Sequence, residues 1–173
     1  NLEEAKALAE KSGLTDTTLH YIYFTQRPNM KETAQIVQQQ LEKIGVKVEI
    51  AGYDNGEFFG HLFAAWISGE TVEDTSWDIA SNGMDSLNAD PATKMTSWKG
   101  ELIQNGFYMS DATKELWEKA AQSLDETERE ELYKELQVQM NEDYPFYPMA
   151  NTNYVIVARK EFKGLDTVPN YPI

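Results

Sequence analysis

The pattern of apolar and polar positions in the first 50 residues switches between a helical and a strand period. Apolar residues recur at helical spacing in residues 2–11, and again in residues 30–44, where they form one continuous stripe. Residues 17–25 are rich in β-branched and aromatic side chains, and residues 46–50 alternate between apolar and polar ones. The order strand, helix, strand within about 34 residues is that of a βαβ unit, so we expect its two strands to lie parallel in one sheet.

The rest of the chain also predicts alternating helices and strands, which is typical of an α/β fold. A helical stripe followed by a loop and a short apolar run predicts a helix at 57–68 and a strand at 76–80. Two further helices are expected, one beginning at Ser110 or Asp111 and one capped by Asp125. A last strand is expected at 154–158, followed by a tail at 160–173.

One long stretch, residues 81–106, has no clear period and contains many turn-forming residues. Such a stretch is uncommon in a compact domain and is often functional where it occurs. Its amides and carboxylates offer hydrogen-bonding groups and its aromatic rings offer flat contact area, which together suit a peptide ligand. A plain solvated loop, with its tryptophans buried in the core, accounts equally well for the same composition. The side chains concerned are Asn82, Asp85, Asn88, Asp90, Trp98 and Asn105, flanked by Trp77 and Tyr108.

Composition and charge exclude several classes of partner, cofactor and catalysis for this chain. The chain has 29 acidic and 15 basic residues and a formal net charge of −14, which argues against nucleic acid or an anionic membrane as its main partner. It has no cysteine, which excludes disulfide scaffolds, iron–sulfur clusters and thiol catalysis. His20 and His61 belong to different elements and match no paired-histidine motif. We therefore expect neither a metal nor a cofactor.

The sequence gives little support to an enzyme. It contains no Gly-x-Ser-x-Gly, Walker or dinucleotide-binding motif. Two carboxylates from Asp78, Asp85 and Asp90 could form the pair that a glycosidase needs, although with 29 acidic residues some will lie close together by chance. A small glycosidase using Asp78 and Asp90 is kept as an alternative, and no catalytic residue is assigned.

Several motifs follow one another in an order that is specific even though each motif alone is weak. They include Gln-Leu-Glu-Lys-Ile-Gly-Val-Lys-Val at 40–48, Trp-Asp-Ile-Ala-Ser-Asn-Gly at 77–83, Asp-Pro at 90–91, Asn-Glu-Asp-Tyr-Pro at 141–145 and Phe-Lys-Gly-Leu at 162–165. Together with the first helix and the paired late helices, this order resembles the C-terminal lobe of the oligopeptide- and dipeptide-binding proteins of ABC importers, which are family 5 solute-binding proteins. The resemblance covers nearly the whole chain.

The resemblance implies one lobe of a periplasmic-binding-protein-like fold, with a central mixed sheet flanked by helices. Residues 1–173 would then be a single α/β lobe of a larger two-lobe protein, and the tail at 160–173 would lead back toward the missing N-terminal lobe. Members of the family enclose a peptide between two lobes, deliver it to ABC permease subunits and perform no chemistry. The resemblance places the protein outside the cytoplasm, in the periplasm or on the cell surface as a lipid-anchored protein.

The same resemblance places a ligand site directly after the strand at 76–80. It would comprise Asn82, Gly83, Met84 and Asp85, with Asp90 and Trp98 as outer members. In peptide binders of this family an Asp near this point holds the amino terminus of the peptide, and Asp85 is the nearest match by position. Met84 departs from the family pattern, which often has Trp there. Two alternatives stay open, namely a receptor lobe that senses a peptide and signals through a partner, and a carrier of another solute such as a nickel complex, haem, a sugar or an opine.

Overall fold

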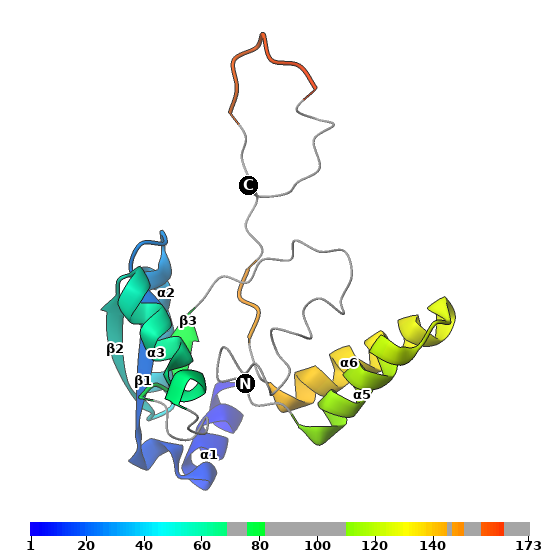
Figure 1. The fold of residues 1–173 in the computed structure, drawn as a ribbon. Helices are drawn as coiled ribbons and strands as arrows, with labels where there is room; N and C mark the ends of the chain where they lie inside the picture. Colours follow the sequence, from blue (N-terminus) through cyan, green and yellow to red (C-terminus); the bar gives the residue numbers. More distant parts are fainter. Residues whose placement is uncertain (69–75, 82–109, 145–146, 151–156, 165–173) are drawn as a thin grey trace. The chain divides into compact units, whose positions relative to one another are not determined.

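The computed structural model divides the chain into two compact units. The first contains the described residues up to Ser81, and the second contains those from Ser110 onward (Figure 1). The structure describes residues 1–68, 76–81, 110–144, 147–150 and 157–164.

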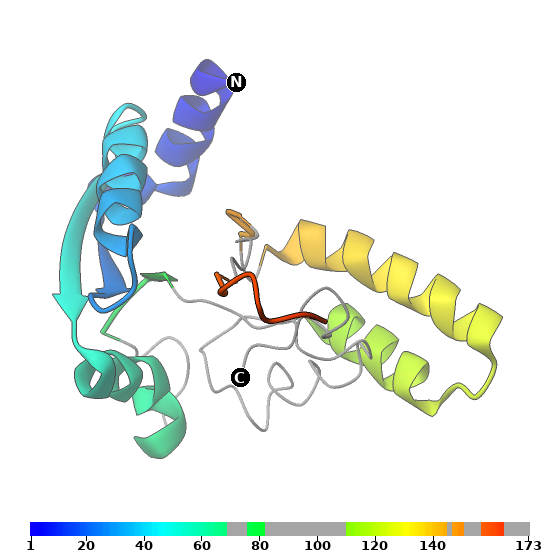
Figure 2. The same cartoon turned by 90° about the horizontal axis from the view of Figure 1, so that it is seen from above.

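The first unit alternates helices and strands, as the apolar pattern predicts. Its elements are α1 (Leu2–Ser12), the short 3-10 helix η1 (Leu14–Asp16), β1 (Thr18–Phe24), α2 (Met30–Glu42), β2 (Lys47–Tyr53), α3 (Asn55–Ser68) and β3 (Ile79–Ser81) (Figures 1 and 2). The predicted helix–strand order is confirmed throughout this unit. Two boundaries differ from the prediction: β2 runs on to Tyr53 although the alternation in the sequence ends earlier, and β3 begins at Ile79 and not at residue 76.

The described strands form one parallel sheet in the order β2-β1-β3. Thr18 pairs with Lys47 across β1 and β2, and Tyr21 pairs with Ile79 across β1 and β3. The predicted βαβ unit is therefore confirmed. The expected mixed sheet would need an antiparallel strand, and each of the described strand pairs is parallel. The strand expected at 154–158 falls mostly outside the described residues and stays a prediction.

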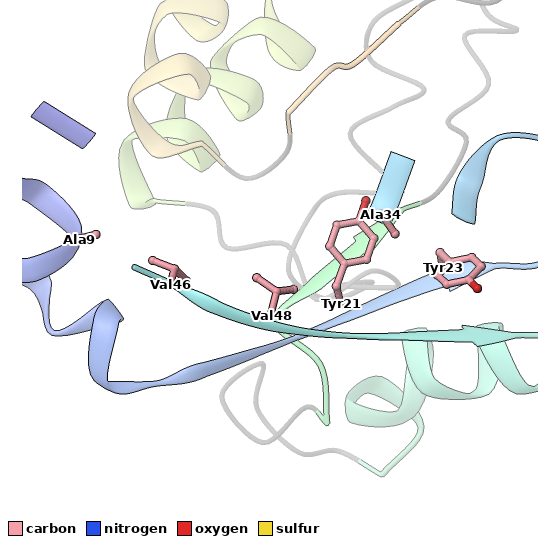
Figure 3. Packing of buried hydrophobic residues seen from close by; sticks show 6 residues of the cluster. All are labelled: Ala9, Tyr21, Tyr23, Ala34, Val46 and Val48. Carbon is pink, nitrogen blue, oxygen red and sulfur yellow. The ribbon is translucent and has the colours of Figure 1, made fainter. Parts of the chain in front are cut away.

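The middle strand β1 packs against helices on both of its faces. On one face Tyr21 and Tyr23 lie with Ala34 of α2, in a cluster that also contains Ala9, Val46 and Val48 (Figure 3). On the other face Ile22 packs with Phe58 and Leu62 of α3. Helices α2 and α3 therefore cover opposite faces, and the buried run Tyr21, Ile22 and Tyr23 has the continuous apolar character of a parallel strand covered on both sides.

A strand glycine makes room for one of these aromatic rings. Gly52 in β2 pairs with Tyr23 in β1, and a Cβ built on Gly52 would lie 2.5 Å from Tyr23 Cζ and 2.8 Å from Thr25 Cγ2. Tyr23 is only 8% exposed, so its ring has little freedom to move aside. The glycine thus allows the ring to lie over the neighbouring backbone, a known reason for glycine inside a strand.

The second unit contains the helices α5 (Asp111–Gln122) and α6 (Glu126–Asp143), which pack against each other. Their buried apolar residues are Trp117 and Ala120 of α5 and Leu136 of α6. Both helices begin with a side-chain cap. Ser110 Oγ accepts the backbone N–H of Thr113, and Asp125 Oδ1 accepts the N–H groups of Thr127 and Glu128 at 2.8 and 3.0 Å. The predicted cap at Asp125 is therefore confirmed, and α5 begins at Asp111, one of its two predicted starts, with Ser110 as its cap. Each cap satisfies amides that the first turn leaves unpaired.

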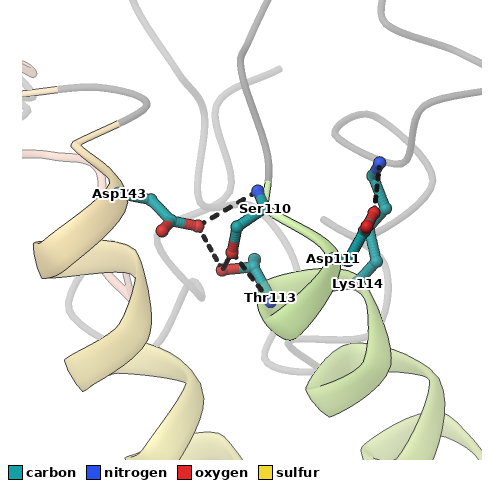
Figure 4. Close-up of polar contacts among 5 residues, drawn as sticks. All are labelled: Ser110, Asp111, Thr113, Lys114 and Asp143. Atoms are coloured by element: carbon teal, nitrogen blue, oxygen red, sulfur yellow. Dashed lines mark hydrogen bonds and ion pairs between the residues drawn. The ribbon is translucent and has the colours of Figure 1, made fainter.

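One carboxylate ties the start of α5 to the end of α6. Asp143 Oδ2 accepts the backbone N–H of Ser110 at 3.1 Å and the hydroxyl of Thr113 at 2.6 Å (Figure 4). Its Oδ1 accepts an N–H of Gln139 at 3.0 Å. Burial pushes the pKa of the Asp143 carboxyl upward, but the bonds from Ser110, Thr113 and Gln139 outweigh it and hold the pKa below its ordinary value. The ionised form is therefore the one that this contact favours.

We expect Gly52→Ala to destabilise the first unit by about 1–3 kcal/mol, because the added methyl group overpacks the site under Tyr23. Gly60→Ala is the matched control, since a Cβ there meets nothing within 4 Å and the position is exposed in α3. Alanine should stabilise that helix by about 0.5–1 kcal/mol. Urea unfolding measures both changes, and a Gly52→Ala protein as stable as its parent would show that the ring moves aside freely.

Acid should weaken the α5–α6 contact through Asp143. Because its folded-state pKa is lowered, the stabilisation is fully present above the ordinary carboxyl pKa of 3.8 and is lost as the pH falls through the folded value. Asp143→Asn should therefore lose less stability than the parent between pH 6 and pH 3, as measured by unfolding followed by circular dichroism. Thr113→Val, which removes one donor, should reduce the same pH dependence. Equal acid sensitivity in parent and Asp143→Asn would contradict this assignment.

Candidate functional site

The carboxyl ends of the three parallel strands meet at one edge of the sheet. Phe24, Tyr53 and Ser81 are the last residues of β1, β2 and β3. The chain passes from β1 to β2 on one side of the middle strand and then returns to β3 on the other side, with α2 and α3 on opposite faces. In open α/β sheets ligands bind outside the carboxyl ends of the strands at such a reversal of strand order. The reversal here lies between the ends of β1 and β3.

Hydrogen bonds hold this edge in a defined shape. Both the backbone N–H and the hydroxyl of Thr25 donate to the carbonyl of Tyr53, each at 2.9 Å. Asp54 then starts α3, because its carbonyl accepts the N–H of Phe58 and its Oδ1 accepts the N–H of Glu57 at 3.0 Å. The ends of β1 and β2 and the start of α3 are therefore joined directly at the edge.

A cluster of aromatic rings lies beside this edge. The ring of Phe24 is 5.8 Å from that of Phe58 and 6.1 Å from that of Phe59, and Phe59 stacks on Phe63 at 5.5 Å. Phe58 is fully buried, while Phe24, Phe59 and Phe63 are only partly buried. Partly exposed rings of this kind can contact an apolar ligand side chain. The sequence analysis placed Phe59 and Phe63 only within the predicted helix at 57–68. Their spacing of four residues, which puts both rings on one side of a helix, was the signal for more.

Next to this cluster, His61 joins α3 to the residues that lead into β3. Its ring lies 4.3 Å from that of Tyr53, and its Nδ1 is 3.3 Å from the hydroxyl of Ser76. The indole N–H of Trp77 donates to the carbonyl of His61 at 3.0 Å. These contacts support the approach to β3 and account for His61 without a ligand role.

The third strand ends in a buried polar contact. The hydroxyl of Ser81 shares a hydrogen bond with the hydroxyl of Tyr21 in the middle of β1. Burial raises the pKa of the Tyr21 phenol above its ordinary value, and the bond to Ser81 acts in the opposite direction. The phenol is therefore neutral at physiological pH, and the pair makes one neutral hydrogen bond inside the core.

The site residues predicted from the sequence follow Ser81 directly in the chain. They lie outside the described residues and stay predictions, namely Asn82, Gly83, Met84, Asp85, Asp90 and Trp98. The fold nevertheless shows where the chain enters this stretch. Ser81 ends the described part of β3 at the reversal of strand order, and Asn82 follows it directly in the sequence.

Asp78, one of the two carboxylates of the glycosidase alternative, lies at the other end of β3. Its Oδ2 accepts the backbone N–H of His20 at 2.7 Å, and its own N–H donates to the carbonyl of His20 at 2.9 Å. The ring of His20 lies 3.4 Å from this carboxylate and 3.8 Å from that of Glu49. Asp78 therefore anchors the start of β3 to β1, which accounts for it structurally.

Within the part of the chain that the structure describes, no three His, Cys, Asp or Glu side chains group closely enough to hold a metal ion. Among the same residues, no helix combines the length and the apolar character needed to span a membrane.

Known proteins that are similar to this chain have the same class of α/β fold. Residues 1–106 match the model of the bacterial extracellular solute-binding proteins, family 5 middle region. The dipeptide-binding protein of Pseudomonas aeruginosa is 27% identical, with 96% of this chain aligned to 31% of that protein. Among solved structures, the periplasmic binding protein DppA of Helicobacter pylori, in complex with the peptide STSA, has a TM-score of 0.67 and 27% identity, covering 84% of this chain and 28% of that one. The ABC transporter substrate-binding protein CtaP of Listeria monocytogenes has a TM-score of 0.70 at 24% identity, covering 83% of this chain and 28% of that one.

The α/β architecture is thus that of a periplasmic-binding-protein-like fold, as the sequence predicted. The chain belongs to the family 5 bacterial extracellular solute-binding proteins, because the family model matches more than half of it. It spans about a third of the length of the curated relatives that it matches.

We expect Asp78→Ala to lower the free energy of unfolding by about 1 kcal/mol, because the His20 amide loses its charged acceptor in a half-exposed site. Asp78→Asn is the matched control, since its amide oxygen can accept the same N–H and should keep most of the stability. Urea unfolding of the three proteins distinguishes the roles. Equal losses in both variants would show that the charge beside His20, and not the bond to its amide, carries the effect.

Proposed function

We propose that the protein containing this chain is the substrate-binding component of an ABC importer, which captures peptides between two lobes and delivers them to a membrane permease. Membership of the solute-binding family is the observation that carries this proposal. The reversal of strand order at the carboxyl edge supports it, because it offers a ligand position on this chain. Relatives named for binding dipeptides and a structural neighbour holding the peptide STSA favour a peptide over other solutes.

In this proposal residues 1–173 form one lobe of the protein and supply part of the ligand contacts. The other lobe belongs to the remaining two thirds of the length of its relatives, and residues 160–173 lead toward it. A ligand that touches both lobes stabilises the closed arrangement and shifts the population toward it. One lobe alone should therefore bind a peptide weakly.

The proposed contacts use the residues that follow β3. Asp85 would hold the ammonium group at the amino terminus of the peptide, and Asn82 and Gly83 would pair with its backbone. Met84 and Trp98 would offer apolar contact area, and Asp90 would contribute at the rim or organise the turn before Pro91. The aromatic cluster of Phe24, Phe59 and Phe63 would border this site on the side of β1. None of these roles makes or breaks a covalent bond, so the protein would be a carrier and not an enzyme.

The remaining parts of the proposal concern location and partners. Its relatives include a periplasmic binding protein, which supports a place outside the cytoplasm, in the periplasm or as a lipid-anchored protein on the cell surface. The partners would be the peptide, the other lobe and the permease subunits. Loss of peptide uptake on deleting the permease supports import, whereas a peptide response that survives this deletion would support the receptor alternative.

The binding role can be tested by calorimetry on the full-length protein with tetra-alanine and with its N-acetylated form. Asp85→Asn should weaken binding of the free peptide by about thirtyfold, because the ammonium group of the peptide would lose its charged partner. Acetylation should have little further effect in this variant, since the group that Asp85 holds is already gone. Asp16→Asn is the control, because Asp16 is exposed in η1 and has no part in the proposed site, and it should bind within about threefold of the parent.

Two outcomes would contradict the proposal. If Asp85→Asn and acetylation weaken binding independently, Asp85 does not hold the amino terminus. If the full-length parent binds a nickel–histidine complex or a sugar but neither free nor acetylated peptide, the ligand class is wrong.

A further inference from the structure

A buried polar pair joins β3 to the middle of the sheet one residue before the proposed site begins. Tyr21 is 2% exposed and lies in the apolar cluster with Ala34 and Val48 (Figure 3). Its hydroxyl bonds that of Ser81, which is 9% exposed and ends β3. A hydrogen bond in an otherwise apolar core favours one arrangement of the two strands, because any arrangement that breaks the bond leaves two buried hydroxyls without partners.

This bond favours the observed register of β3 over registers shifted by one or two residues. Ser81 pairs with Tyr23 across the sheet, and the hydroxyl bond runs diagonally to Tyr21 on the same face. A shift of β3 by two residues would keep the faces but place Ile79 or Gly83 where Ser81 stands, and neither has a hydroxyl. A shift by one residue would move Ile79 and Ser81 to the opposite face, toward Phe58 and Ile22.

The described part of β3 is short, so few of its backbone contacts oppose a shift. It comprises Ile79–Ser81, and within the described residues it pairs with β1 at Tyr21, Ile22 and Tyr23. Asp78 anchors the start of β3 through His20, and Ser81 anchors the last described residue through Tyr21. The two side-chain anchors therefore hold a segment whose described backbone pairs specify its register weakly.

We propose that Tyr21 and Ser81 are positioning residues for ligand binding, because their bond fixes the register of the strand that the proposed site residues follow directly in the sequence. This inference rests on the proposed function, since it assigns a role in a site that the function requires. The stability of the core does not require this pair. Phenylalanine in place of Tyr21 and alanine in place of Ser81 would fill similar volumes and would bury no polar group. Buried polar groups that set a register are a documented use of such pairs.

The test uses the full-length protein with Tyr21→Phe, Ser81→Ala and the double variant. Tetra-alanine affinity is measured by calorimetry, thermal stability by calorimetric melting, and opening of β3 by hydrogen exchange at the amides of Ala80 and Ser81. Each single variant should weaken binding about tenfold and speed β3 exchange about tenfold, because one hydroxyl is left without a partner. In the double variant the melting temperature should return close to that of the parent, while the affinity and the β3 exchange should not.

Val48→Ala is the matched control, because Val48 belongs to the same cluster but lies in β2. It should lower the melting temperature and leave the affinity within about twofold of the parent. If the double variant regains affinity together with stability, or if the single variants leave β3 exchange unchanged, the pair is merely structural and the inference is wrong. If the parent itself fails to bind any peptide, the proposed function fails, and the exchange data still decide whether the pair holds the register.

Discussion

The burial of β1 on both faces is the constraint on which the first unit depends. A strand with Tyr21, Ile22 and Tyr23 all buried needs a helix on each side, so α2 and α3 must cross the sheet on opposite faces. With right-handed crossovers, this requires the chain to place β2 on one side of β1 and β3 on the other. The reversal of strand order, and with it the position for a ligand, follows from the apolar character of one short segment.

The elements were predictable where a local pattern carries the information. The stripe on α2, the alternation in β2 and the caps at Ser110 and Asp125 each depend on residues within a few positions of one another. The end of β2 was missed because Gly52 interrupts the strand pattern. A glycine is needed at this position because the ring of Tyr23, in another strand, lies against it. The resemblance to a family then supplied the class of protein, which no periodicity could.

The parts that the sequence could not predict are contacts across long separations. Nothing near Ser81 indicates that its hydroxyl meets Tyr21, and nothing near Asp78 indicates that its carboxylate accepts the amide of His20. Seen in the sequence alone, Asp78 was one more acidic residue available for chemistry. Its use as a strand anchor appears only once β1 and β3 lie side by side, because hydrogen-bond partners depend on the register of the sheet.

The small size of β3 also bears on the order in which the unit assembles. β1 and β2 are joined through a single helix, whereas Ser81 meets Tyr21 across 60 residues of chain. Contacts between distant segments form late, because closing a long loop costs entropy before any contact repays it. The strand that carries the chain into the proposed site should therefore dock onto a βαβ core that has already formed. A nascent chain would hold the pair β1 and β2 first, and the edge proposed to bind the ligand would be complete only after β3 has joined.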